Sequence, residues 1–173
     1  MSRAAILAGG RGRRMGGVNK ALLEVEGRRI IDRQLDVLAP LFDEVLLVVA
    51  APDGWNVPRA RLVVDRRPGL GPLAGLEAAL QDGDVFAVAC DMPFLDGQII
   101  RQICALSGTV VPRVEGRPQP LHARYAAGAL AAVSRRLEAG ALRMLDLLAD
   151  LEVTYLDLPP QRGFTNLNFP LPR

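Results

Sequence analysis

A loop rich in glycine and in basic residues follows the first apolar run of the chain, and it reads LAGGRGRRMGGVNK over residues 7–20. The loop holds five glycines and four cations. Glycine leaves the backbone open, so successive N–H groups can converge on an anion. Arg14 and Lys20 can add charge-assisted hydrogen bonds to phosphate oxygens. Because the glycines directly follow a strand-like run, a phosphate cradle is favoured over a plain surface loop, with contacts at Gly9, Gly10 and Gly12.

Lysine is almost absent from this chain. Of the 21 basic side chains, 20 are arginine, and the only lysine is Lys20 in the glycine-rich loop. Lysine carries a compact point charge with rotatable donors, whereas arginine presents a broad planar fork. The choice of lysine at this one position indicates a site that needs a point charge.

Two well-known phosphate loops are excluded by individual residues. A P-loop requires Gly-Lys-Ser/Thr, but here Lys20 lies between Asn19 and Ala21, which supply neither the glycine nor the magnesium-binding hydroxyl. A dinucleotide-binding fingerprint requires a third small residue where this chain has Met15. The loop therefore belongs to another class of nucleotide site.

Two aspartates end apolar strand-like runs further along the chain, Asp65 in RLVVD and Asp91 in CDMPFL. Magnesium binds through one or two carboxylates together with phosphate oxygens. Asp91 is the candidate metal ligand, and a cap on the following turn is its alternative structural role. A phosphate loop at the same edge of a sheet favours the metal.

The remaining reactive side chains offer little chemistry. His122 is the only histidine, so it forms no metal site by itself; a substrate contact and a polar surface position are both open for it. Cys90 and Cys104 form no zinc pattern and are expected to be reduced thiols near the core. No serine or cysteine has a neighbouring base, so no nucleophilic triad is predicted.

Apolar patterning predicts alternating strands and helices across one domain, residues 1–173. The predicted strands are residues 3–8, 44–51, 61–65, 84–90, 109–114, 120–125 and 151–158, and helices are expected over 29–42, 73–80, 99–106, 126–138 and 141–149. This order predicts an α/β fold: a three-layer, Rossmann-like, mostly parallel mixed sheet, with 110–125 breaking the alternation. Ligands of such sheets bind beyond the carboxyl ends of the strands, so the loop, Asp65 and Asp91 should meet at one edge.

Composition limits the partners. Half of the residues are hydrophobic, and the net charge of +2 is too small to indicate binding to nucleic acid or an anionic membrane. The N-terminal apolar run is too short for a signal peptide or a membrane span. A cytoplasmic protein is expected.

Taken in order, these motifs resemble the molybdenum cofactor guanylyltransferase family. The resemblance rests on residues 7–27, Asp65, GPLAGLEAAL at 71–80 and CDMPFL at 90–95, and it extends to QPLHARY at 119–125 and NLN at 166–168. It implies a nucleotide-diphosphosugar-transferase-like fold. It also implies transfer of GMP from GTP to molybdenum-bound molybdopterin with release of pyrophosphate.

The resemblance assigns roles to single residues. It implies backbone contacts of Leu7, Ala8 and Gly9 with guanosine, and a bond from Lys20 to the phosphates. It implies a place for Asp65 in the nucleotide site and for Asp91 as the ligand of both Mg²⁺ and nucleotide. The GPLAG and QPLHA stretches would face the pterin.

The implied mechanism follows from charge. The attacking terminal phosphate of molybdopterin is already anionic, so no general base is required. The barrier lies in bringing two anions together, and Mg²⁺ on Asp91 with Arg14, Lys20 and the loop N–H groups would neutralise the developing charge. Arg14, Lys20 and Asp91 are therefore the predicted catalytic residues.

One departure from the family keeps alternatives open. Ala50 stands where such enzymes often place an asparagine that touches the nucleotide. Base recognition must then rely on backbone groups or on Asp65. Cytidylyl or uridylyl transfer to molybdopterin or to a sugar or polyol phosphate is the near alternative. A non-catalytic nucleotide-binding protein that delivers the cofactor to an apo-enzyme is the distant one. Molybdenum cofactor biosynthesis proteins and acceptor apo-enzymes are further candidate partners.

Overall fold

The structure is a computed structural model, and it describes residues 2–9 and 20–167. The strands are β1 (Arg3–Leu7), β2 (Glu24–Val25), β3 (Arg28–Arg29), β4 (Glu44–Val49), β5 (Arg61–Val64), β6 (Val85–Ala89), β7 (Thr109–Val114), β8 (Arg117–Pro118), β9 (His122–Tyr125) and β10 (Val153–Leu158). The α-helices are α1 (Ile30–Leu38), α2 (Pro72–Leu80), α3 (Gly97–Cys104), α4 (Leu130–Glu138) and α5 (Met144–Leu147). Short 3-10 helices are η2 (Lys20–Leu22), η3 (Ala127–Ala129), η4 (Leu148–Asp150) and η5 (Arg162–Phe164).

One large mixed sheet runs through the molecule in the order β10-β7-β9-β6-β1-β4-β5, with β8 paired to β7. Strands β6, β1, β4 and β5 are parallel neighbours, as are β10 and β7. Strand β9 lies antiparallel between β6 and β7. The predicted mixed, mostly parallel sheet is thereby confirmed, and β9 supplies the break in alternation that the sequence indicated at 110–125.

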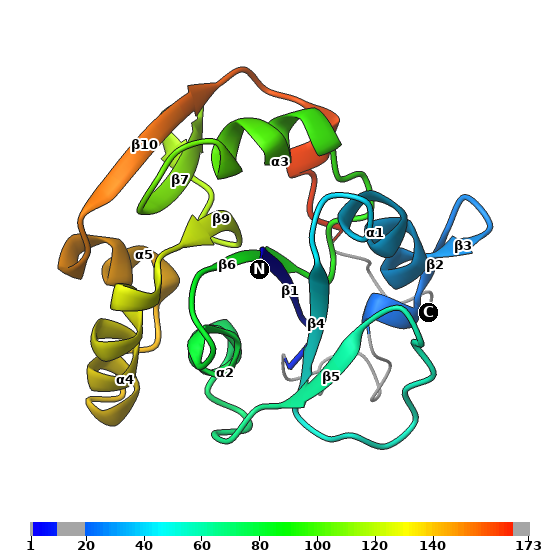
Figure 1. Cartoon of the computed structure of the whole chain (residues 1–173), viewed down its shortest axis with the longest axis horizontal. Helices are drawn as coiled ribbons and strands as arrows, with labels where there is room; N and C mark the ends of the chain where they lie inside the picture. The colour runs from blue at the N-terminus through cyan, green and yellow to red at the C-terminus, as the bar shows by residue number, and fades with distance from the viewer. Residues whose placement is uncertain (1, 10–19, 168–173) are drawn as a thin grey trace, which may run out of the picture.

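Helices cover both faces of this sheet, as Figure 1 shows. Alternate residues of β1 enter different cores: Ala5 and Leu7 pack with α2, α4 and α5, whereas Ala4 and Ile6 pack with α1 and α3. A strand that is apolar on both faces requires such a double covering. The three-layer α/β prediction is therefore confirmed.

Several predicted boundaries were too generous. Helix α1 ends at Leu38 rather than at Phe42. Pro40 has no N–H to donate, and the chain turns through residues 39–42 toward β4. The predicted helix at 141–149 contracts to one turn of α-helix, α5, followed by the 3-10 helix η4.

A two-stranded hairpin, β2–β3, was missed. Its turn holds Glu26 at φ 51° and Gly27 at φ 74°, a pair of left-handed residues that closes a two-residue hairpin. Strands of two residues are too short to show a period, so the sequence pattern could not reveal them. Among the described residues, no helix is long and apolar enough to cross a membrane.

Candidate functional site

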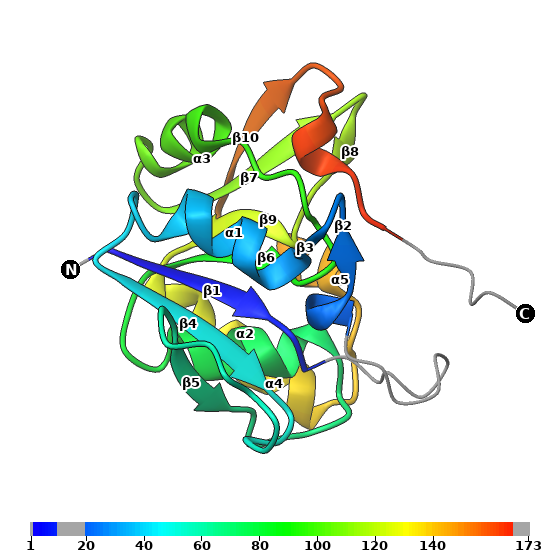
Figure 2. The same ribbon diagram turned by 90° about the vertical axis from the view of Figure 1, so that its right-hand side faces the viewer.

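The carboxyl ends of β1, β4, β5 and β6 lie along one edge of the sheet, because these four strands are parallel neighbours. In Figure 2 this edge is on the right, the side toward which the arrow of β1 points and on which the β2–β3 hairpin also lies. The predicted gathering of the glycine-rich loop, Asp65 and Asp91 at one edge therefore agrees with the topology.

Lys20 and Asp91 form an ion pair at this edge. Lys20 Nζ lies 3.1 Å from Oδ2 of Asp91, although 71 residues separate them in sequence. The side chains are 32% and 19% exposed, so water shields the pair only in part. Helix η2, which begins at Lys20, presents the ammonium to the turn after β6. At this edge, the ammonium of Lys20 can bind a phosphate group, and the carboxylate of Asp91 can bind the metal cation that accompanies it.

Asp65 lies at the end of β5 and is only 3% exposed. Its Oδ1 accepts a 2.7 Å hydrogen bond from the backbone N–H of Arg67, while Oδ2 is buried and has no partner among the described residues. Burial raises the pKa of the Asp65 carboxyl above its ordinary value; the Arg67 N–H opposes this rise, and nearby Glu77 adds to it. A buried acceptor without a donor is a position that a ligand N–H or O–H can fill.

Gly9 faces this carboxylate. A Cβ added to Gly9 would lie 3.6 Å from Oδ2 of Asp65 and 3.8 Å from the backbone nitrogen of Ala50. Any side chain longer than a methyl group would therefore occupy the space beside Asp65. The backbone nitrogen of Ala50 therefore lies beside Asp65 at this place.

Leu7 and Ala8 are tied into the sheet at the start of the loop. The carbonyl of Leu7 accepts from the N–H of Cys90 at 3.3 Å, and the N–H of Ala8 donates to the carbonyl of Val48 at 2.8 Å. These bonds hold the first residues of the loop against β4 and the turn after β6. Gly10, Gly12 and Arg14, three further predicted site residues, lie outside the described residues.

Asp65 and Asp91 do not share one ion. They follow β5 and β6, which are three strand spacings apart in the sheet, or about 14 Å at ~4.8 Å per spacing. The described residues contain no group of three or more His, Cys, Asp or Glu side chains that could hold a metal ion. Asp91, as a single carboxylate ligand, fits a magnesium ion that takes its other ligands from phosphate oxygens and water. A ligand that reaches both aspartates must be elongated, as a nucleoside triphosphate is.

The turn that carries Asp91 is held by groups that the sequence reasoning missed. Gln34 and Arg33 of α1 donate to its carbonyls, and the backbone N–H of Leu167 donates 2.9 Å to the carbonyl of Asp91. The available signal was Gln34 itself, a polar residue on the apolar face of α1 beside Ile31 and Leu35.

The GPLAG and QPLHA stretches both start near this edge, but Gly75 and His122, near the ends of the two stretches, pack against other elements. A Cβ on Gly75 would lie 3.4 Å from Leu7, an ordinary van der Waals contact, so α2 packs directly against β1 at this position. His122 is fully buried, which excludes the surface position. Its ring lies 5.3 Å from that of Phe86 and 4.8 Å from that of Phe164, and burial lowers its pKa to about 4.

Neither cysteine is paired. Cys90 precedes Asp91, and burial raises the pKa of its thiol to about 12. A thiol in that state supplies no nucleophile at neutral pH. Both cysteines pack against the hydrophobic core, which agrees with the expected placement of the thiols.

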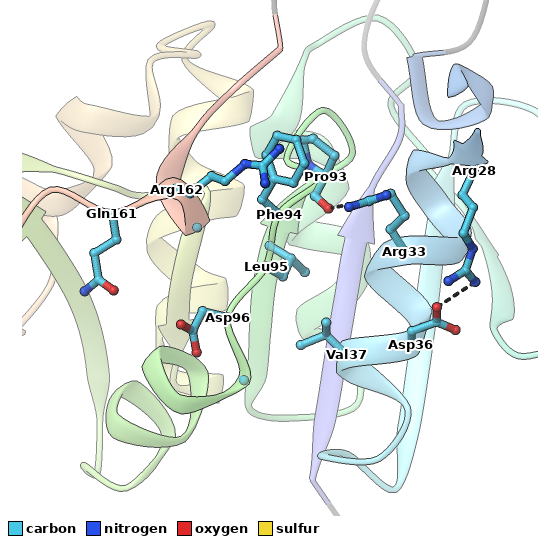
Figure 3. Close-up of a pocket in the computed structure, with 12 residues that line it drawn as sticks. Arg28, Arg33, Asp36, Val37, Pro93, Phe94, Leu95, Asp96, Gln161 and Arg162 are labelled. Atoms are coloured by element: carbon cyan, nitrogen blue, oxygen red, sulfur yellow. Dashed lines mark hydrogen bonds and ion pairs between the residues drawn. The ribbon is translucent and has the colours of Figure 1, made fainter. Parts of the chain in front are cut away.

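A pocket of about 650 Å³ lies beside the site, between α1, the Pro93–Gly97 segment and η5. Figure 3 shows Phe94 between Arg33 and Arg162, whose guanidinium carbons lie 5.3 and 3.5 Å from the ring centroid. Glu26 pairs with both arginines, at 3.0 and 2.7 Å. The single carboxylate offsets one of these two positive charges, and Arg162 places the tail against the ring of Phe94.

Comparison with known proteins identifies the family. Residues 4–153 match the family described as "MobA-like NTP transferase domain". A relative from Pelotomaculum thermopropionicum, named "Probable molybdenum cofactor guanylyltransferase", is 37% identical over 94% of this chain and 82% of its own length. A second relative of the same name, from Thermococcus gammatolerans, is 34% identical over 95% of this chain and 93% of its own length.

A solved structure supports the same placement. The molybdopterin-guanine dinucleotide biosynthesis protein A of Archaeoglobus fulgidus superposes with a TM-score of 0.75 and 27% identity, over 90% of this chain and 83% of the other. The resemblance seen in the sequence is therefore confirmed. The chain belongs to the MobA-like NTP transferase family, and it is a nucleotidyltransferase of the nucleotide-diphosphosugar-transferase fold.

Proposed function

We propose that the chain transfers GMP from GTP to molybdopterin, with or without bound molybdenum, and releases pyrophosphate. The product is the guanine dinucleotide form of the molybdenum cofactor. The names of the relatives support this reaction, and the predicted activity agrees with them. The observation that carries it is the contact between Lys20 and Asp91 at the edge where the glycine-rich loop begins.

Asp65 is proposed to bind the nucleoside. Its buried Oδ2, without a partner among the described residues, calls for an N–H or O–H donor, and guanine offers N1–H and the N2 amino group on one edge. Gly9 leaves room for that approach, and the backbone nitrogen of Ala50 lies beside it. Asp65 and the backbone together can thus take over nucleotide contacts from the asparagine whose place Ala50 occupies.

Lys20 and Asp91 are proposed to act at the phosphates. The ammonium of Lys20 can rotate toward a phosphate oxygen, and Asp91 can then hold a magnesium ion together with the nucleotide. When bound, Mg²⁺ would supply charge neutralisation on the α- and β-phosphates and on the leaving pyrophosphate. Arg14, assigned from the sequence, would add a second cation.

The reaction needs no general base from the protein. The attacking phosphate of molybdopterin is an anion at neutral pH, so the protein must align two anionic groups and offset their repulsion. Cys90, with its raised pKa, and His122, buried against two aromatic rings, offer no competing nucleophile or base. We propose that the enzyme acts in the cytoplasm, where its two free thiols stay reduced.

The decisive test is a panel of GTP, CTP, UTP and ATP with Mg²⁺ and molybdopterin, read as pyrophosphate release. We expect release with GTP and at least about tenfold less with the others, which corresponds to one lost hydrogen bond. Release with CTP instead would identify a cytidylyltransferase, the alternative that Ala50 keeps open. Nucleotide binding without pyrophosphate release would favour a delivery protein.

A further inference from the structure

The side chain of Gln34 in α1 hydrogen-bonds the turn that follows β6. The amide nitrogen Nε2 of Gln34 donates to the carbonyl of Ala89 at 2.8 Å and to that of Met92 at 3.0 Å. These two carbonyls bracket Asp91 on either side. A single amide therefore fixes both ends of the turn that presents the carboxylate to Lys20.

Neighbouring groups fix the rest of this turn. Arg33, the residue before Gln34, donates from Nε to the carbonyl of Pro93 at 3.2 Å, the contact drawn in Figure 3. The backbone N–H of Leu167, in the C-terminal tail, donates to the carbonyl of Asp91 at 2.9 Å. Within residues 89–93, four backbone carbonyls thus accept hydrogen bonds from α1 or from the tail. Gln34 donates two of these four hydrogen bonds.

Gln34 occupies a place where a polar side chain is unfavourable. It is fully buried on the face of α1 formed by Ile31, Leu35 and Leu38. Its oxygen Oε1 has no hydrogen-bond partner among the described residues. A buried acceptor without a donor destabilises the fold, whereas the two bonds from Nε2 stabilise it by satisfying the carbonyls of Ala89 and Met92. The two bonds from Nε2 are what an apolar residue could not provide.

We propose that Gln34 is a positioning residue that sets the Asp91 carboxylate against Lys20. The inference rests on the proposed function in one respect, because Asp91 is taken as the magnesium ligand. The geometric part is independent of it: without Gln34, the turn loses two of its anchors and the Lys20–Asp91 contact loosens.

Because Lys20 is the only lysine of the chain, the state of the Lys20–Asp91 contact can be measured directly. Lysine labelled with ¹³C at Cε gives one lysine signal, that of Lys20, in a protein spectrum recorded without nucleotide or metal. The Asp91→Asn variant defines the signal of an unpaired Lys20. We expect Gln34→Met, which is close in volume but cannot donate, to move the Lys20 signal in the same direction. Gln34→Asn keeps a donor but is too short to reach both carbonyls. Its Lys20 signal should therefore lie between that of the unsubstituted chain and that of Gln34→Met.

The control is Ile31→Val on the same helix, equally buried and three residues away. It removes one methylene from the core and contributes no hydrogen bond to the turn. It should lower the melting temperature while leaving the Lys20 signal unchanged. A Gln34→Met signal that coincides with that of the unsubstituted chain would overturn the proposal, and so would an Asp91→Asn variant that leaves the signal in place.

A double variant separates positioning from general loosening. In the Asp91→Asn background, Gln34→Met should add no further change to the Lys20 signal, since its effect passes through Asp91. An added change equal to that of the single variant would assign Gln34 a merely structural role.

Kinetics supply the second readout. Gln34→Met should lower kcat about 10- to 100-fold, as expected for a small misplacement of a reacting group, with little change in KM for GTP. The Mg²⁺ concentration for half-maximal rate should rise. If the unsubstituted chain shows no turnover with any nucleotide, the proposed function fails, whereas the lysine signal still decides the role of Gln34.

Discussion

Replacing Asp65 by asparagine should change stability and nucleotide binding in opposite directions. Asparagine keeps an oxygen that can accept the 2.7 Å bond from the N–H of Arg67. It replaces the buried, unpartnered Oδ2 by a neutral amide group. The substitution therefore removes a desolvated charge from the fold and, in the same step, removes the acceptor proposed for the nucleoside.

The magnitudes follow from the environment of the two oxygens. A buried polar group without a partner destabilises a protein by about 1–3 kcal/mol, more when it is charged. Because an uncharged amide without a partner is less unfavourable, we expect Asp65→Asn to gain about 1–2 kcal/mol in the free energy of unfolding at pH 7. Loss of a hydrogen bond to a charged acceptor removes about 1.5–3 kcal/mol, so GTP should bind about 10- to 150-fold more weakly.

The pH dependence independently tests the sign of the stability change expected for Asp65→Asn. The folded pKa of Asp65 is raised, chiefly by burial, above the ordinary value of 3.8. Well below that value the carboxyl is protonated in both states, and the two proteins should be similarly stable. As the pH rises, the unfolded chain ionises first, so the advantage of Asp65→Asn should grow and then level off above the folded pKa.

Urea denaturation from pH 4 to 8, with calorimetric titration of GTP and Mg²⁺, measures both effects. Asp157→Asn is the control: Asp157 is exposed, and its pKa is lowered by hydrogen bonding to Arg113 at 2.7 Å. This variant should not be more stable than the parent. Asp65→Asn that is less stable than the parent at pH 7 would refute the reasoning, because the carboxylate would then be supported within the fold.

Three further outcomes are expected. Lys20→Arg should lower pyrophosphate release about 100-fold or more with the fold unchanged, because a planar fork beside Asp91 cannot replace a rotatable point charge; a near-normal rate would contradict this. Asp91→Asn should abolish magnesium-dependent release, and Mn²⁺ titration of the GTP complex should show weaker binding; full metal affinity would remove Asp91 from the metal site. The fold should weaken as the pH falls from 6.5 toward the His122 pKa of about 4, by about 3 kcal/mol in total, because burial disfavours the imidazolium. His122→Phe should abolish this part of the pH dependence in denaturation experiments, and an unchanged pH profile would exclude His122 as its source.

The lysine and the two aspartates of the proposed site could be found from the sequence. Each of the three follows directly from a local pattern: Lys20 ends a glycine-rich loop, and Asp65 and Asp91 end apolar strands. The rule that parallel strands share a carboxyl edge was then enough to bring them together. Their order along that edge was not predictable, since it depends on which strands pair.

The groups that hold the site were not visible in the same way. Gln34 interrupts an apolar helix face, and helical periodicity alone assigns such a residue no partner. Its partners, Ala89 and Met92, lie 55 and 58 residues away. The bond from Leu167 to Asp91 spans an even longer stretch and uses only backbone atoms. Backbone groups carry no sequence signal, because every residue other than proline has them.

The sequence by itself determined the fold class, the glycine-rich loop with its single lysine, and the two strand-end carboxylates, because these depend on residue type and short-range spacing. The tertiary structure decided that Lys20 contacts Asp91 and that Asp65 is buried with one oxygen lacking a partner among the described residues. It also decided that His122 belongs to the core and that Gln34 hydrogen-bonds both ends of the turn that carries Asp91. These properties arise from contacts between distant segments, and burial and hydrogen bonding are set only when the strands and helices pack.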